Sequence, residues 1–202
     1  MVPLVYHPAY NITAFGLERL HPFDSRKYGR IRDALVVLGL RRGSEFIRPR
    51  PVSRAELAAV HTAEYLRSLR RPAELAGIFE VPMAGRLPGW VLDWRVLRPM
   101  RLATGGTILA CRKAMEHGVA INLGGGFHHA AAGGGGGFCV YADIPLAARV
   151  LHDGGRVSRV LVVDLDAHQG NGTASTIRDW PWASIVDVYQ DSLFPTRKEP
   201  DP

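Results

Sequence analysis

Hydrophobic residues along this chain form a few short continuous runs separated by longer stretches with helical spacing. Val160–Leu165 (VLVVDL) is almost wholly apolar, which is typical of a strand covered by helices on both faces of its sheet. Further strands are predicted at Val2–Tyr6, Val119–Leu123 and Ser184–Tyr189. The chain therefore carries several buried-strand candidates spread from end to end.

Helices are predicted between these runs. They cover about Ser25–Leu38, Glu56–Val60, Thr62–Leu69, Pro99–His117 and Ile144–Leu151. Asp24 is the expected N-cap of the first and Gly39 its end, while a capping-box pattern starting at Ser53 opens the second. Pro and Gly punctuate Pro72–Trp94, which is predicted to be a loop region. Strands that alternate with helices favour a parallel α/β sheet.

Two unusual segments directly follow strand candidates. GGGFHH occupies Gly124–His129, and DLDAHQGNG occupies Asp164–Gly172. Ligands of parallel α/β sheets bind outside the carboxyl ends of the strands. We therefore expect the chemistry of this protein at these two segments.

Length and composition are those of an ordinary globular protein. The chain has 202 residues, of which 47% are hydrophobic, enough for one sizeable core and one domain. Charges interrupt every long apolar stretch, so no membrane span is predicted. The start MVPLVYHPAYN lacks the features of a secretory signal, and a cytoplasmic location is expected.

The net charge of +6 comes mainly from scattered arginines. Short pairs such as Arg41-Arg42 are typical of solvated helix ends, so no direct nucleic-acid binding is predicted. Cys111 and Cys139 have neither CxxC spacing nor neighbours at metal-ligand spacing. Both are expected to be reduced, buried thiols.

Asp164-Leu165-Asp166-Ala167-His168 is the sharpest chemical signal. If the strand stays extended through it, Asp164, Asp166 and His168 point to one side, because side chains alternate along a strand. Such a group of carboxylates and an imidazole suits a cation such as zinc, manganese or iron. Alternatively, the two aspartates cap the following turn and the histidine is exposed.

His128-His129 follows a run of glycines that allows the backbone to approach a site closely. Two imidazoles beside a metal could supply the base and the acid of amide hydrolysis. An adjacent histidine pair is also common in cores and on surfaces. The neighbouring Gly133–Gly137 run lacks the GK[ST] ending of a P-loop and the spacing of GxGxxG, and a flexible loop is the preferred interpretation.

Taken together, INLGGGFHH, GGGFCVYADI and VDLDAHQGNG resemble the histone deacetylase family, most closely its class IV branch, which is also common in bacteria. NITAFGLERLHPFDSRKYGRI, VHTAEYL and VLRPMRLATGGTILA agree with this and occur in the same order. The resemblance covers nearly the whole chain.

The resemblance implies a role for each matching residue. Asp166 and His168 match two of the three zinc ligands, His129 the histidine that acts as general base and then acid, and His128 its electrostatic neighbour paired with Asp164. Asn171 stands where other classes often carry an aspartate that supports the catalytic histidine, and asparagine is what the class IV branch shows there. Gly137 and Phe138 match the lining of the acyl-lysine channel.

By the same resemblance, the chain is the N-terminal portion, residues 1–202, of one arginase-deacetylase domain, a three-layer αβα fold with a mainly parallel sheet. The implied function is zinc-dependent removal of acetyl or longer acyl groups from lysine side chains of proteins, or from small acylated amines. The third zinc ligand and the carbonyl-polarising tyrosine of the family lie further downstream than Pro202.

Two other functions are compatible with the sequence. An incomplete chain could be a catalytically inactive binding or assembly partner that keeps at most a weak metal site. An arginase-like binuclear manganese hydrolase shares the fold, but it needs a DxHxD-type cluster, and the position two after His168 is Gly170.

Overall fold

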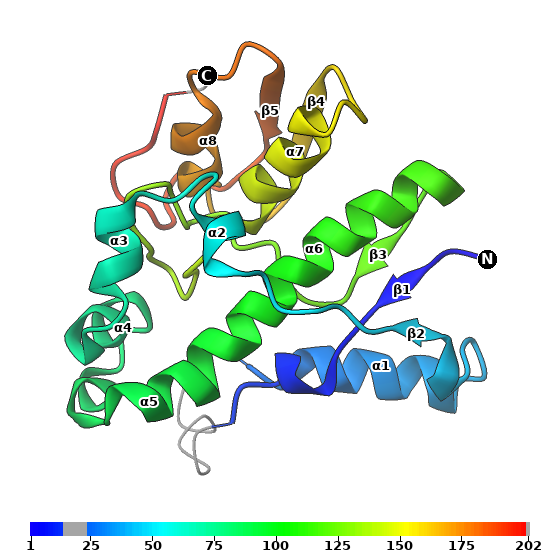
Figure 1. Cartoon of the computed structure of the whole chain (residues 1–202), viewed down its shortest axis with the longest axis horizontal. Coiled ribbons are helices and arrows are strands. Elements are labelled where there is room, and N and C mark those ends of the chain that lie inside the picture. The colour runs from blue at the N-terminus through cyan, green and yellow to red at the C-terminus, as the bar shows by residue number, and fades with distance from the viewer. Residues whose placement is uncertain (14–23, 201–202) are drawn as a thin grey trace. The chain divides into compact units, whose positions relative to one another are not determined.

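The computed structural model describes residues 1–13 and 24–200, which form two compact units. One unit consists of Met1–Ser53 and Leu87–Gly125, and the other of Arg54–Arg86 and Gly126–Pro202 (Figure 1). Residues 14–23, in the middle of the NITAFGLERLHPFDSRKYGRI motif, lie outside the described residues. Within the described part of the chain, no helix is long and apolar enough to cross a membrane.

The first unit contains a three-stranded parallel sheet in the order β2-β1-β3. The strands are β1 (Leu4–Val5), β2 (Phe46–Ile47) and β3 (Ile121–Asn122). The strands predicted at Val2–Tyr6 and Val119–Leu123 are thus confirmed in place, although both are shorter than predicted. β2 was not predicted, because two apolar residues between charged and Pro-containing segments give no strand periodicity.

Helices of the first unit are α1 (Lys27–Val37), α5 (Gly89–Leu92) and α6 (Arg98–His117), with a π-helical turn at Asp93–Leu97 and 3-10 turns at Pro8–Tyr10 and Gly43–Glu45. The predicted long helix is confirmed as α6, which ends at Gly118 with φ +81°. The N-cap prediction for Asp24 is wrong, because α1 begins after Arg26. The Asp24 carboxylate instead accepts the Arg26 N–H at 3.0 Å, which stabilises the turn before the helix.

Asn122 ties the sheet of the first unit to α6. Its side-chain Oδ1 accepts the hydroxyl of buried Tyr10 at 2.9 Å, while its Nδ2 donates to the Ala103 carbonyl and the Thr107 hydroxyl, each at 3.1 Å. The contact requires α6 to approach closely at Gly106, where an added Cβ would lie 2.0 Å from the Tyr10 hydroxyl. Glycine is therefore needed here for space.

We expect Gly106→Ala to destabilise the chain by about 1–3 kcal/mol, because the methyl group would displace the Tyr10–Asn122 hydrogen bond. Gly77→Ala is the matched control, since Gly77 also lies within a helix and its Cβ would meet nothing within 4 Å. The control should be neutral or stabilising by up to about 1 kcal/mol. Urea unfolding measures both, and equal stability of the two variants would contradict the packing argument.

The second unit contains a two-stranded parallel sheet of β4 (Val160–Asp164) and β5 (Ala183–Asp187). Its helices are α2 (Arg54–Leu57), α3 (Ala63–Ser68), α4 (Pro72–Ile78), α7 (Asp143–Asp153) and α8 (Asn171–Ile177), with a 3-10 turn at Pro82–Arg86. The sheet confirms the predicted parallel pairing, and α3 and α7 lie where helices were predicted. Thr62 caps α3 by accepting the Tyr65 N–H at 3.1 Å.

The predicted loop at Pro72–Trp94 is wrong, because α4 and α5 lie within it. Pro72 occupies the first turn of α4, where its missing N–H costs nothing, and Leu75 and Ile78 bury one face of this helix. α8 was not predicted because its small, polar sequence NGTASTI has weak helix propensity. The capping box at Ser53 gives only the short α2, which ends at Leu57, before the predicted Val60.

The apolar sequence of β4 was interpreted as a strand covered on both faces, and this is wrong for the described part of the chain. Side chains of β4 alternate in burial, and Leu161 and Val163 are 61% and 56% exposed. Val186 of β5 is 50% exposed. An apolar face of this sheet is thus open where the sequence pattern indicates that it should be covered.

His61, just before α3, holds the Gly-rich segment in place. It is 3% exposed, its Nδ1–H donates to the Ala132 carbonyl at 3.3 Å, and its Nε2 accepts the Ala142 N–H at 3.0 Å. Burial lowers the pKa of His61 to about 4. The neutral ring is therefore the form that fits this position.

A pH-dependent stability follows for His61. The unfolded chain binds the proton near pH 6.5 and the folded chain near 4, so the stabilisation is present above pH 6.5 and is lost as pH falls toward 4. We expect His61→Gln to lower the free energy of unfolding by about 1–3 kcal/mol at pH 7. The fall of this free energy with decreasing pH should also become shallower, by up to about 1.4 kcal/mol per pH unit. Chemical unfolding between pH 7 and 4.5 measures this, with exposed His117→Gln as control. An unchanged slope in His61→Gln would count against the buried neutral ring.

Candidate functional site

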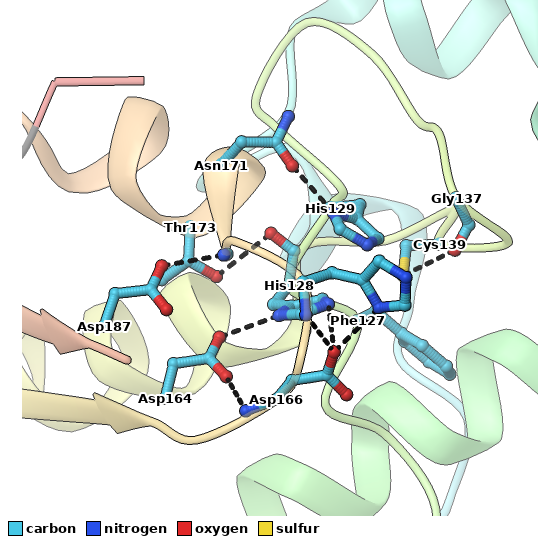
Figure 2. Close-up of polar contacts among 12 residues, drawn as sticks. Phe127, His128, His129, Gly137, Cys139, Asp164, Asp166, Asn171, Thr173 and Asp187 are labelled. Carbon is cyan, nitrogen blue, oxygen red and sulfur yellow. Dashed lines mark hydrogen bonds and ion pairs between the residues drawn. The ribbon is translucent and has the colours of Figure 1, made fainter. Parts of the chain in front are cut away.

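The carboxyl end of β4 forms the centre of the candidate site. β4 ends at Asp164, so the condition that the strand stays extended through His168 is not met. The chain turns instead, because the Asp164 carboxylate accepts the Asp166 N–H at 3.0 Å and the Asp166 carboxylate accepts the His168 N–H at 2.8 Å. These aspartates therefore cap the turn, as the alternative interpretation held, and also face the histidines (Figure 2).

A buried carboxylate fixes the loop that carries the histidine pair. Asp143, the first residue of α7, is 0% exposed and accepts the N–H groups of Gly126 at 2.9 Å and Phe127 at 2.8 Å. The amino end of α7 favours this negative charge. The GGGF segment is thus held by backbone hydrogen bonds directly before His128.

α8 fixes the histidine pair from a second direction. The Thr173 N–H donates to the His128 carbonyl at 2.9 Å. Gly172 lies so close that an added Cβ would be 2.3 Å from the carbonyl carbon of His129. The backbone of the pair is therefore clamped between Asp143 and the amino end of α8, as Figure 2 shows for Thr173.

His128 forms a buried pair with Asp164, and their Nδ1 and Oδ2 atoms lie 2.8 Å apart. Burial alone would lower the pKa of His128, but the hydrogen bond and charge of Asp164 outweigh it, and the pKa is raised. Burial likewise opposes the charge of Asp164, yet the hydrogen bonds from His128 and the Asp166 N–H lower its pKa. This pair therefore favours an imidazolium next to a carboxylate.

His129 has a neutral partner instead. Its Nδ1 lies 2.7 Å from Oδ1 of Asn171, the first residue of α8 (Figure 2). Burial, followed by the charge of His128 at a ring distance of 4.1 Å, lowers the pKa of His129 to about 4. Because the Asn171 oxygen accepts, the proton resides on Nδ1 and the lone pair on Nε2. His129 is thus neutral, with an unprotonated Nε2.

Asp166 and His168 are the exposed members of the cluster, with side-chain exposures of 53% and 44%. Oδ1 of Asp166 lies 3.0 Å from Nδ1 of His168 and 4.0 Å from Nε2 of His128. Burial opposes the charge of Asp166, but hydrogen bonds from His168 lower its pKa and keep it ionised. One carboxylate oxygen and one imidazole nitrogen therefore lie close enough to share a cation.

This pair fits two of the three protein ligands that a catalytic zinc site takes. Among the described residues, no group of three His, Cys, Asp or Glu side chains forms a metal cluster. Asp187 has a different contact in the site, because its carboxylate accepts the Gly170 N–H at 2.8 Å. The geometry therefore supports a partial metal site at Asp166 and His168.

The Gly-rich segment lies against His129. Gly137 has φ +49°, and an added Cβ there would be 2.4 Å from Cδ2 of His129. Phe138 also has positive φ, at +66°, and its N–H donates to the Ile78 carbonyl at 3.1 Å. On another side, the ring of Phe194 lies edge-on to His129 with centroids 4.9 Å apart and is 47% exposed. The catalytic-histidine candidate thus has both backbone and aromatic neighbours.

The structure brings together seven of the residues that the sequence predicted for the site: His128, His129, Asp164, Asp166, His168, Asn171 and Gly137. Phe138 follows Gly137, and the contact described for it is with Ile78. Sequence reasoning missed the supporting roles of Asp143, Gln169, Thr173 and Phe194. Only Asp143 had a signal, because it precedes a predicted helix. The roles of the others depend on contacts between segments distant along the chain.

Comparisons with known proteins agree with this geometry. A family model described as "Histone deacetylase domain" matches residues 21–202. The chain is 43% identical over 194 residues to "Histone deacetylase 2" of Arabidopsis thaliana, covering 96% of this chain and 50% of that protein. It is 31% identical over 207 residues to "Acetoin utilization protein AcuC" of Bacillus subtilis (strain 168), covering 95% and 50%.

A solved structure, "Crystal Structure of HDA15 HD domain", matches with a TM-score of 0.73 at 20% identity. The match covers 96% of this chain and 56% of that one. It confirms the predicted α/β fold of arginase-deacetylase type. The chain spans about half the length of the two curated relatives named above.

Zinc binding by the chain should depend on the exposed pair. We expect Asp166→Asn and His168→Ala each to weaken it by about tenfold or more, because each removes one of two adjacent donors. Asp153→Asn is the matched control, since Asp153 lies beside His152 in an exposed pair outside the site. Competition with a chromogenic chelator measures the affinities. A loss of zinc affinity in Asp153→Asn alone would contradict the assignment of the metal site to Asp166 and His168.

Proposed function

The chain belongs to the histone deacetylase family, and on this basis we propose that it forms part of a zinc-dependent hydrolase that removes acetyl or longer acyl groups from lysine side chains. One observation carries the proposal: two histidines with different partners, His128 with Asp164 and His129 with Asn171, lie beside Asp166 and His168. Amide hydrolysis needs a base, an acid and an electrophile, and this cluster supports all three.

His129 is proposed as the general base and later the general acid. Its neutral ring carries the proton on Nδ1, toward Asn171, and presents Nε2 to an attacking water molecule. The pKa of about 4 keeps the ring unprotonated before the reaction. After accepting a proton at Nε2, His129 can donate it to the leaving amine.

His128 is proposed as the electrostatic neighbour. Its raised pKa and its contact with Asp164 favour a positive charge on one side of the reacting amide. Such a fixed charge stabilises the negative oxygen that develops in the transition state. The 4.1 Å spacing of the two rings also discourages a second positive charge on His129.

Asp166 and His168 would hold the zinc ion, with a third ligand supplied by sequence beyond the present chain. Zinc in such a site acts as a Lewis acid toward the amide carbonyl and lowers the pKa of water. The donor set supports this assignment, because an ionised carboxylate and an imidazole suit zinc. The 3.0 Å separation of their donor atoms is compatible with one shared ion.

Gly137 and Phe138 are proposed to line the channel for the acyl-lysine chain, since the backbone at Gly137 touches the ring of His129. The substrates proposed are acyl-lysine proteins or small acylated amines, with no direct nucleic-acid contact. A cytoplasmic location belongs to the same proposal.

We further propose that the working enzyme is longer than 202 residues and that the present chain is the N-terminal portion of one deacetylase domain. The curated relatives named above are about twice as long as the part matched here. The open apolar face at Leu161, Val163 and Val186 supports this, because folded proteins ordinarily cover such a face with another element. The third zinc ligand and the carbonyl-polarising tyrosine of the family would belong to the same remaining portion.

A second function is favoured by one observation, namely that no three-donor metal cluster forms among the described residues. The chain on its own would then be an inactive binding or assembly partner. Turnover of an acyl-lysine peptide by the 202-residue chain alone, abolished by a zinc chelator, would rule this function out.

The test of the proposed function uses the full-length protein and an acetyl-lysine peptide. We expect activity that is lost with a chelator and restored by zinc. His129→Ala should lower kcat on the order of 10²-fold or more, because the general base is removed, whereas exposed His117→Ala should leave kcat unchanged. A near-wild-type kcat for His129→Ala would remove His129 from the mechanism.

A further inference from the structure

Gln169 is a fully buried amide next to the candidate metal ligand His168, and no step proposed above uses it. Its Nε2 donates to the Glu199 carbonyl at 2.8 Å, and its Oε1 accepts the Glu199 N–H at 2.9 Å. One side chain thus pairs with both backbone groups of Glu199. Such a doubly hydrogen-bonded, water-free contact fixes both the position and the direction of the backbone that it binds.

Lys198 closes the same segment from its other side. Its Nζ donates to the carbonyls of Leu193 at 2.6 Å and Pro195 at 2.8 Å, and it lies 5.4 Å from the centroid of the Tyr189 ring. A cation bound to two carbonyls three and five residues earlier closes a compact loop. An ion pair between Arg178 and Glu199 adds a further tie to the same segment.

The residue carried by this closed loop is Phe194. Its ring lies edge-on to His129 at 4.9 Å and is 47% exposed, so one side touches the proposed base while the other is open. Gln169 and Lys198 do not touch His129 in any contact described for them. They act on the position of Phe194 through the backbone of residues 193–199.

We propose that Gln169 and Lys198 are positioning residues that hold Phe194 against His129 and so set how bulky an acyl group can lie beside the base. The substrate class favoured is an unbranched acyl chain, because a branch on the side of the base would meet the apolar ring held against His129. This inference rests on the proposed deacylase function for its effect on substrates. The placement of Phe194 itself rests only on the described contacts.

The placement is tested first in the full-length protein by nuclear Overhauser effects between the Phe194 and His129 ring protons. Wild type should show the effect, and Gln169→Ala and Lys198→Met should each weaken it several-fold while the chain remains folded by circular dichroism. Lys198→Arg should retain it, since the guanidinium can still donate to the two carbonyls. Gln190→Ala is the matched control, because that amide contacts only exposed Ser192 in the bonds described for it.

If Gln169→Ala fails to fold, Gln169→Glu replaces it, since a carboxylate keeps one hydrogen bond to Glu199 and should give an intermediate effect. A full-strength effect in folded Lys198→Met and in the folded Gln169 variant would overturn the proposal. Loss of the effect in the Gln190→Ala control would overturn it as well, because the ring would then respond to any change in this region.

The consequence for substrates is tested in the full-length protein with butyryl-lysine and isovaleryl-lysine peptides. The ratio of kcat/KM for linear over branched chains should fall by about tenfold in Lys198→Met, mainly through KM, and Lys198→Arg should restore it. An unchanged ratio in an active enzyme would overturn the role in selectivity. Absence of any deacylase activity would refute the proposed function and the selectivity role with it, while the ring contact would still be decided by the first measurement.

Discussion

The buried carboxylate of Asp143 is the interaction on which the candidate site depends. It accepts the N–H groups of Gly126 and Phe127 from the first turn of α7, without any exposure to solvent. These two hydrogen bonds stabilise a buried carboxylate, so the loop and the first turn of α7 hold each other in place. His128 follows this loop directly, and its carbonyl accepts the Thr173 N–H. The histidine pair is therefore anchored through its backbone as well as through the side-chain contacts of His128 with Asp164 and of His129 with Asn171.

That anchoring gives two neighbouring imidazoles opposite electrostatic surroundings. His128 faces a carboxylate and has a raised pKa, whereas His129 faces a carboxamide and has a lowered one. Adjacent residues of the same type would titrate alike in an unfolded chain. The difference arises because Asp164 comes from the end of β4 and Asn171 from the beginning of α8. One sharp turn between these two elements thus gives the two histidines partners of different charge.

The same turn presents Asp166 and His168 outward, where they remain the most exposed members of the cluster. The exposure of this pair and the open apolar face of β4 and β5 support the same proposal. Both are features that a folded protein ordinarily covers, one by a cation and further ligands, the other by packed side chains. Under the proposal that the working enzyme is longer than the present chain, the remaining portion would cover both features.

Residue types alone indicated the carboxylates, the imidazoles and the Asn171 amide of the candidate site. The spacing in DLDAH and GGGFHH placed carboxylates and imidazoles at the ends of strands, because parallel sheets expose those ends. The long amphipathic helix and the apolar strand runs were also predictable, since their periodicity is local.

Only the tertiary structure decided which side chain is hydrogen-bonded to His128 and which to His129. The pairing of His129 with Asn171 joins residues 42 positions apart, and sequence spacing cannot fix such a distance in space. It also decided that the chain turns after Asp164, because the Asx-type hydrogen bonds of Asp164 and Asp166 compete successfully with an extended strand. The contact of Phe194 with His129 and the burial of Gln169 likewise arise from packing between distant segments, for which no local pattern exists.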